Sequence, residues 1–160
     1  MTQEERRKVI MEMEILAKDI RGQILNAFTL LEFNINSLIF HYGLFEKPQL
    51  LSMKDRKEFF KKCISEFEKT CNIIFTDINT NIDIVFEKRN KLVHWAMDMS
   101  DDSIKLFLKN QKIKLHDLDK KTVEYFKIDS AKELKYKLDI VAVCALQMMC
   151  ALNLFHKHST

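Results

Sequence analysis

The scarcity of residues that break helices is the feature that most constrains this chain. Two glycines and one proline occur in 160 residues, so tight turns are easy at few positions. Hydrophobic residues make up 47% of the sequence and charged residues 31%, which is typical of a packed helical protein and excludes a disordered chain. We therefore expect long helices in one domain that spans residues 1–160.

The first third of the sequence places apolar residues at every third or fourth position from Val9 to Tyr42. This spacing predicts one long helix that ends at Gly43. Gly22 lies inside the stripe, and glycine costs a helix roughly 1 kcal/mol relative to alanine, so we expect a bend or a close contact there. Gly43 and Pro48 then mark a loop.

Two more helical segments follow this loop. Ser52, with Asp55 in the first turn, is expected to cap a second helix that buries apolar residues as far as Phe67. A third stripe runs from Ile74 to Val93. The C-terminal end of this third helix carries the sequence Arg-Asn-Lys-Leu-Val-His.

The period of the apolar residues changes from helical to alternating between about residues 103 and 128. This alternation predicts a small β-hairpin inserted between helices, with its turn at Asn110 and Gln111. The alternating apolar positions are Ile104, Leu106 and Leu108, then Ile113 with Leu115, and Val123 with Tyr125.

A last long helix is predicted after the hairpin. Ser130 and Glu133 have the spacing of a capping box, in which both side chains bind free N–H groups of the first helical turn. The apolar stripe of this helix consists of Leu134, Leu138, Val141, Ala145, Met148, Leu152 and Phe155, and it is widened by Val143, Leu146, Met149 and Cys150. Such a wide face fits either a homodimer interface, which we expect, or a helix buried at the centre of a monomeric bundle.

Charge and cysteine usage limit the class of protein. The formal net charge is +3, so any contact with nucleic acid must be local. Cys63, Cys71, Cys144 and Cys150 lie in apolar helical contexts without Cys-x-x-Cys spacing, so we expect reduced core residues. No apolar run reaches the roughly 18 residues of a membrane span, and no signal core follows the N-terminus, so we expect a cytoplasmic protein without membrane contact.

Arg89, Asn90 and His94 carry the groups that cleavage of RNA by its own 2′-hydroxyl requires. The reaction needs a base, an acid for the leaving 5′-oxygen and positive charge at the phosphate, and it needs no metal or cofactor. Histidine titrates near neutrality, and the arginine fork binds two phosphate oxygens. Asn90 lies one helical turn before His94, where its amide can orient the ring or bind a phosphate oxygen.

The spacing of these residues adds a second argument for a dimer. Arg89 and His94 are about 140° apart around an ideal helix, so both border one cleft only near a helix end or across a dimer seam. One histidine serves poorly as both the acid and the base of the reaction, whereas a two-fold axis at this helix end would bring two histidines and two arginines to one site.

The run from Arg89 to His94, followed by Trp95, resembles the Arg-polar-x-x-x-His motif of HEPN (higher eukaryote and prokaryote nucleotide-binding) domains. The abortive-infection and toxin members are the most similar. The resemblance implies an all-α fold of four or five helices, here with a small β-hairpin insert before the last helix. It also implies a homodimeric, metal-independent endoribonuclease that an antitoxin or regulatory partner restrains. Ala96 stands where toxins silenced by an adenylating nucleotidyltransferase often carry tyrosine, so the resemblance does not extend to that pairing.

Several other residues are weaker candidates for the site. In similar proteins a polar residue of an early helix approaches the motif, so Glu32 is a candidate to orient Arg89 or His94, although it also fits an ordinary exposed glutamate. The lysines that could track RNA phosphates, or could merely keep the surface soluble, are Lys88, Lys91, Lys105, Lys109, Lys112 and Lys114. His156 and His158 lack a nearby cysteine or acid and make a poor metal site, so we expect no metal.

Three functions are open at this point. The first is an endoribonuclease of the toxin or phage-defence type that acts on RNA. The second is a catalytically silent HEPN-like module that binds RNA, a nucleotide or a partner protein. The third is a dimeric scaffold whose wide apolar last helix is the functional surface.

Overall fold

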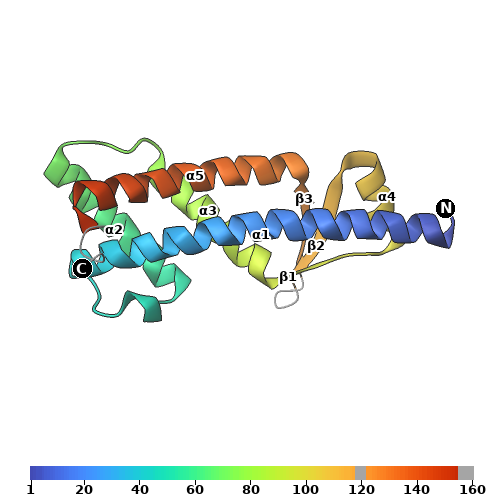
Figure 1. Cartoon of the computed structure of the whole chain (residues 1–160), viewed down its shortest axis with the longest axis horizontal. Helices are drawn as coiled ribbons and strands as arrows, with labels where there is room; N and C mark the ends of the chain where they lie inside the picture. Colours follow the sequence, from blue (N-terminus) through green and yellow to red (C-terminus); the bar gives the residue numbers. More distant parts are fainter. Residues whose placement is uncertain (118–121, 155–160) are drawn as a thin grey trace. The chain divides into compact units, whose positions relative to one another are not determined.

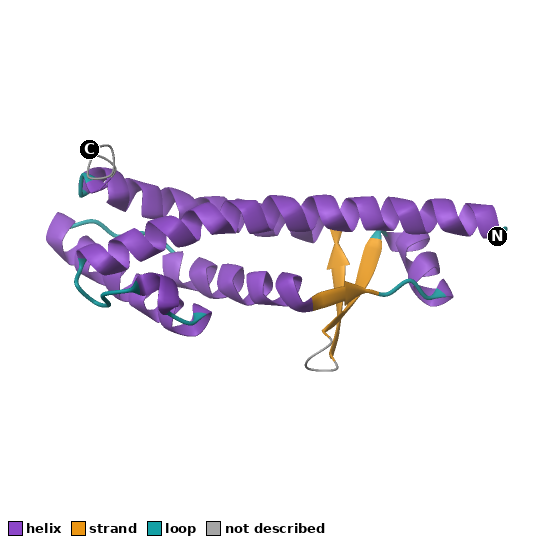
Figure 2. Cartoon of the chain, turned by 60° about the horizontal axis from the view of Figure 1, so that its bottom comes forward, coloured by secondary structure: helices purple, strands orange, loops and turns teal. Residues whose placement is uncertain are grey.

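The computed structural model describes residues 1–117 and 122–154 (Figure 1). These residues form five α-helices, one short 3-10 helix and one three-stranded sheet. The elements are α1 (Gln3–His41), η1 (Pro48–Leu50), α2 (Met53–Cys71), α3 (Ile78–His94), β1 (Trp95–Met97), α4 (Asp101–Asn110), β2 (Lys112–Asp117), β3 (Thr122–Lys127) and α5 (Ile128–Ala151). Helices dominate the described chain, as the sequence predicts (Figure 2).

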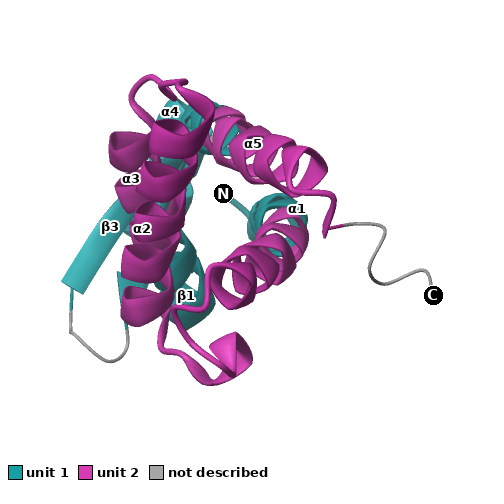
Figure 3. Ribbon diagram, turned by 90° about the vertical axis from the view of Figure 1, so that its left-hand side faces the viewer, with its two compact units in different colours: residues 1–25, 88–135 teal, residues 26–87, 136–160 magenta. Residues whose placement is uncertain are grey.

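The chain divides into two compact units, which Figure 3 colours separately. Unit 1 takes its residues from 1–25 and 88–135 and contains the sheet, α4 and the end of α3. Unit 2 takes its residues from 26–87 and 136–160 and contains α2 with the larger parts of α3 and α5. The single domain expected from the sequence stays a prediction.

Helix α1 ends where the sequence predicts. Gly43 has a φ of +67°, the left-handed conformation that glycine adopts without strain. The N–H of Gly43 donates to the carbonyl of Phe40, and the N–H of Leu44 donates to that of Ile39, which together form a Schellman cap. The close contact expected at Gly22 is wrong, because a Cβ there would meet nothing within 4 Å.

Unit 2 is held by an apolar core to which all of its helices contribute. The rings of Phe28 on α1 and Phe86 on α3 meet edge to face at 5.1 Å. The other fully buried side chains of this unit include Ile35, Leu38, Phe60, Ile64, Ile82, Leu138 and Met148. The predicted cap of α2 is confirmed, since the Ser52 hydroxyl accepts a hydrogen bond from the N–H of Asp55 at 3.1 Å.

Helix α3 begins later than its apolar stripe suggests. Ile74 is 86% exposed and precedes the helix, which starts at Ile78 after Asp77 in a left-handed conformation. Its C-terminal end agrees with the prediction, because the helix ends at His94.

The first strand of the expected hairpin is instead helix α4. Ser100 caps this helix by accepting a hydrogen bond from the N–H of Ser103, and two aspartates follow in the first turn. Ile104 and Phe107 are three residues apart and buried, so a helical period competes with the alternation in this segment. Gln111 ends the helix in a left-handed conformation, so the turn predicted at residues 110–111 is wrong.

The sheet of unit 1 is antiparallel, in the order β1-β2-β3. β2 and β3 form a hairpin within residues 112–127, shorter than expected, and residues 118–121 between them lie outside the described chain. β1 was not predicted, and it pairs Trp95 with Asp117. The buried face of the sheet includes Trp95, Ile113, Leu115 and Phe126.

Helix α5 begins at Ile128, so Ser130 lies inside its first turn and is not its N-cap. The wide apolar face predicted for this helix is partly buried and partly exposed. Met149 is fully buried, whereas Val143 is 54% and Leu146 42% exposed. The expected Phe155 and the two terminal histidines lie outside the described residues.

The cysteines are also split between interior and surface. Cys63 and Cys144 are buried as expected, but Cys71 and Cys150 are exposed, so their assignment to the core is wrong. None of the described helices is long and apolar enough to cross a membrane.

Candidate functional site

The Arg-Asn-x-x-x-His segment occupies the last turns of α3, inside unit 1. His94 is the final residue of the helix, and Trp95 starts β1 directly after it. The last carbonyls of a helix lack partners within the helix and carry partial negative charge. One of these carbonyls, that of Val93, accepts a hydrogen bond from the Nη2 of Arg21 of α1 at 2.9 Å. No pattern in the sequence indicates this contact, because it joins residues far apart in the chain.

The structure brings Arg89 and Asn90 together. The Nη1 of Arg89 donates to the Oδ1 of Asn90 at 3.2 Å. Arg89 is half-buried and its Nε atom is buried, whereas Asn90 and His94 are exposed. One end of the guanidinium is thus fixed within the protein, and the amide and the imidazole face solvent where a substrate can reach them.

Lys88 and Lys91 share one acidic partner. Both form ion pairs with Glu124 of β3, and the Nζ of Lys91 lies 2.8 Å from Oε2. Burial opposes the charged form of Glu124, but hydrogen bonds from the two lysines outweigh it and leave the pKa of this carboxyl below its ordinary value. Lys105 and Lys109, expected on the hairpin, lie exposed on α4 instead.

Glu32 has a partner that the sequence did not suggest. Its Oε1 lies 2.6 Å from Nη1 of Arg56, whose side chain is 5% exposed. Arg56 also donates to Asn36 of α1 at 2.9 Å and to the carbonyl of Pro48 at 3.2 Å. Its side chain therefore connects the loop after α1 to α1 itself. Glu32 and Arg56 belong to unit 2, and the role of Glu32 beside Arg89 or His94 stays a prediction.

Sequence reasoning also missed a histidine and aspartate pair in unit 1. The Nε2 of His116 lies 2.8 Å from the Oδ2 of Asp98, and Lys114 lies 3.2 Å from the same oxygen. The backbone N–H of Ser100 and the imidazole of His116 hold the pKa of the Asp98 carboxyl far below its ordinary value. The alternation of β2 is the signal that could have placed Lys114 and His116 on one face.

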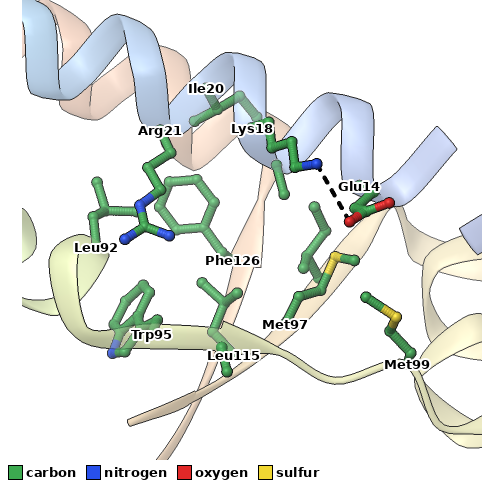
Figure 4. A pocket seen from close by; sticks show the side chains of 13 residues that line it. Glu14, Lys18, Ile20, Arg21, Leu92, Trp95, Met97, Met99, Leu115 and Phe126 are labelled. Carbon is green, nitrogen blue, oxygen red and sulfur yellow. Dashed lines mark ion pairs between the residues drawn. The ribbon is translucent and has the colours of Figure 1, made fainter. Parts of the chain in front are cut away.

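A cavity of about 270 Å³ lies beside the end of α3, also within unit 1 (Figure 4). Its walls are mainly apolar and include Leu92, Trp95, Met97 and Phe126. Glu14, Lys18 and Arg21 of α1 supply its charged side chains, and an ion pair of 3.4 Å joins the first two. Leu92 and Trp95 flank His94 in the sequence, so the cavity adjoins the motif.

No group of three or more histidine, cysteine, aspartate or glutamate side chains is arranged to hold a metal ion within residues 1–117 and 122–154. Comparisons with protein-family models, with curated proteins and with solved structures find no match to this chain.

Proposed function

We propose that this protein is a metal-independent endoribonuclease of the toxin or phage-defence type, which cuts RNA at a composite site in a homodimer. His94 transfers protons, Arg89 stabilises the charged phosphorane and Asn90 positions the phosphate. The toxin or defence role comes from the resemblance of the segment from Arg89 to His94 to HEPN domains. The same resemblance suggests an antitoxin or regulatory partner.

The reaction needs no external oxidant or cofactor. A base removes the proton of the 2′-hydroxyl, and the 2′-oxygen forms a bond to the neighbouring phosphorus. The bond from phosphorus to the 5′-oxygen then breaks, and an acid donates a proton to this leaving oxygen. The products are a 2′,3′-cyclic phosphate and a 5′-hydroxyl.

The observation that carries the proposal is the arrangement at the end of α3. Arg89 is held to Asn90 at 3.2 Å, and Asn90 and His94 are open to solvent. The planar fork of a guanidinium loses little side-chain freedom for each hydrogen bond that it forms with a phosphate, and an exposed imidazole can exchange protons with a substrate.

The homodimer is part of the same proposal. Each chain supplies one histidine of the motif, and the reaction needs an acid and a base, so a second copy completes the pair. Exposed Val143 and Leu146 on α5 support an interface with a second copy, because burial of apolar side chains stabilises association.

The test is cleavage of a mixed RNA pool at neutral pH in EDTA, with analysis of the new RNA ends. We expect the wild type to cut and to leave 2′,3′-cyclic phosphates, and we expect His94→Ala and Arg89→Ala to lose cutting while they remain folded dimers. His41→Ala is the matched control, since His41 is an exposed histidine at the end of α1. Unchanged cutting by the His94 and Arg89 variants would refute the proposal.

Two further outcomes separate the alternatives. If a second copy supplies the other proton-transfer group, the His116→Ala variant should keep its activity. If this variant loses cutting, the two-fold site is replaced by one that pairs His94 with His116. Absence of cutting in a confirmed dimer that still binds RNA would favour the catalytically silent binding module.

A further inference from the structure

The cavity beside α3 combines apolar walls with charges of both signs. Trp95, Phe126 and Met97 form part of its apolar lining, and Figure 4 shows their side chains around one space below α1. Glu14, Lys18 and Arg21 lie above this space on successive turns of α1. An occupant with an apolar body and a polar edge of donors and acceptors would match both parts of this lining.

We propose that this cavity binds one base of the RNA strand that is cut at His94, with a preference for guanine. This inference rests on the proposed function and names the specificity of the same site. Bases have flat faces that stack on aromatic and apolar side chains, and edges that form hydrogen bonds with charged side chains.

The size and the charges of the cavity favour a base over other ligands. Pockets that bury a whole drug-sized ligand have roughly 300–1,000 Å³, so a cavity of about 270 Å³ suits a smaller group. A fatty acyl chain would match the apolar walls but would form no hydrogen bond with Glu14, Lys18 or Arg21. A small anion would pair with Lys18 and Arg21 but would be repelled by Glu14.

Guanine is the base that best matches the charged side of the cavity. Its Watson–Crick edge presents two adjacent N–H donors, which a single carboxylate such as Glu14 binds with both oxygens. Its O6 and N7 are acceptors for a cation, which Lys18 or Arg21 provides. No other base combines two adjacent N–H donors with an acceptor edge of this kind.

A base in this cavity would lie at the end of α3 that carries the motif. Leu92 and Trp95 line the cavity and flank His94 in the sequence. Arg21 lines the cavity and donates to the carbonyl of Val93, the residue before His94. The binding of a base would thus hold the strand at the end of α3, a few residues from the motif, and cleavage requires such positioning.

The experiment uses a natural reporter. Trp95 is the single tryptophan of the chain and lines the cavity, so its fluorescence reports occupancy. We would titrate the full-length protein with the 5′-monophosphates of guanosine, adenosine, cytidine and uridine, and correct for light absorption with free tryptophan. We expect a saturable change that is strongest for guanosine monophosphate.

Variants test the assigned contacts. Glu14→Gln should weaken the binding of guanosine monophosphate by at least about fivefold, the lower end for a bidentate contact between a side chain and a base. Ala17→Phe should fill the cavity and reduce binding of all four nucleotides, since Ala17 lines it. Glu12→Gln is the matched control on the exposed side of α1 and should bind as the wild type does.

Each contrary result overturns the inference. It fails if no nucleotide changes the Trp95 signal, or if Glu14→Gln and Glu12→Gln bind alike. It also fails if the signal changes with protein concentration alone, which would mean that a second copy fills the cavity. The proposed function is tested separately, because His94→Ala should lose cleavage and keep nucleotide binding.

Discussion

The carboxylate of Asp98 and the imidazole of His116 lie 2.8 Å apart, from Oδ2 to Nε2. Asp98 follows β1, and its N–H donates to the carbonyl of Lys114 at 2.9 Å, which extends the pairing of β1 with β2. The same carboxylate accepts the N–H of Ser100 at 2.8 Å, the residue that caps α4. Asp98 therefore joins the end of the sheet to the start of the next helix.

Replacement of Asp98 should destabilise the protein in a pH-dependent way. The pKa of Asp98 is lowered in the folded protein, so its carboxylate stabilises the fold above the ordinary aspartate pKa of about 3.9 and loses this effect as the pH falls towards the lowered value. We expect Asp98→Asn to cost about 1 kcal/mol at pH 7 and progressively less as the pH falls from the ordinary aspartate pKa towards the lowered one. Thermal unfolding of both proteins across this range measures the difference. A constant difference at every pH would contradict this role of the charge.

Arg56 is expected to be the charged residue of unit 2 that tolerates substitution least. Its buried side chain binds Glu32, Asn36 and the carbonyls of Pro48 and Gln49. Arg56→Met would leave these acceptors without their donor and should reduce the free energy of unfolding by about 3 kcal/mol. Urea denaturation followed by circular dichroism measures the loss. Lys54→Met removes an exposed charge from the same helix and should stay within about 0.5 kcal/mol of the wild type.

Local signals account for what the sequence predicted well. Gly43 and Ser52 act within a few residues of themselves, so the end of α1 and the start of α2 follow from sequence alone. The segment 101–110 fits two predictions, because Ile104, Leu106 and Leu108 alternate as in a strand while Ile104 and Phe107 also satisfy a helical period. The cap at Ser100 favours the helix.

Contacts between distant residues account for what the sequence could not predict. Arg56 and Glu32 are 24 residues apart, and Arg21 and Val93 are 72 residues apart, so no periodic pattern links them. The segment from Arg89 to His94 could be proposed from the sequence because its residues lie within two turns of one helix. The cavity beside it was not, because strand register and helix packing bring its walls together.

The cysteines should fall into two reactivity classes. Burial raises the pKa of the Cys63 and Cys144 thiols to about 12, so almost none of either is thiolate at pH 8. Cys71 and Cys150 are exposed. We expect iodoacetamide to modify Cys71 and Cys150 in the folded protein and all four cysteines in urea, as peptide mass spectrometry would show. Rapid labelling of Cys63 or Cys144 without denaturant would contradict their burial.

Glu124 should limit the affinity for RNA, because it neutralises Lys88 and Lys91 beside the motif. Glu124→Gln, made together with His94→Ala to prevent cutting, should bind single-stranded RNA more tightly. The slope of log affinity against log salt should steepen by roughly 0.7 for each lysine that gains a phosphate contact. Fluorescence anisotropy with labelled RNA at several salt concentrations measures both effects.

The control for this experiment is Glu66→Gln in the same background, which makes the same change in net charge on the exposed surface of α2. A gain shared by both variants would come from the change in net charge, because both variants remove one negative charge that repels RNA. A steeper slope confined to Glu124→Gln would assign the gain to Lys88 and Lys91. An unchanged slope would mean that these lysines serve the sheet and do not contact RNA.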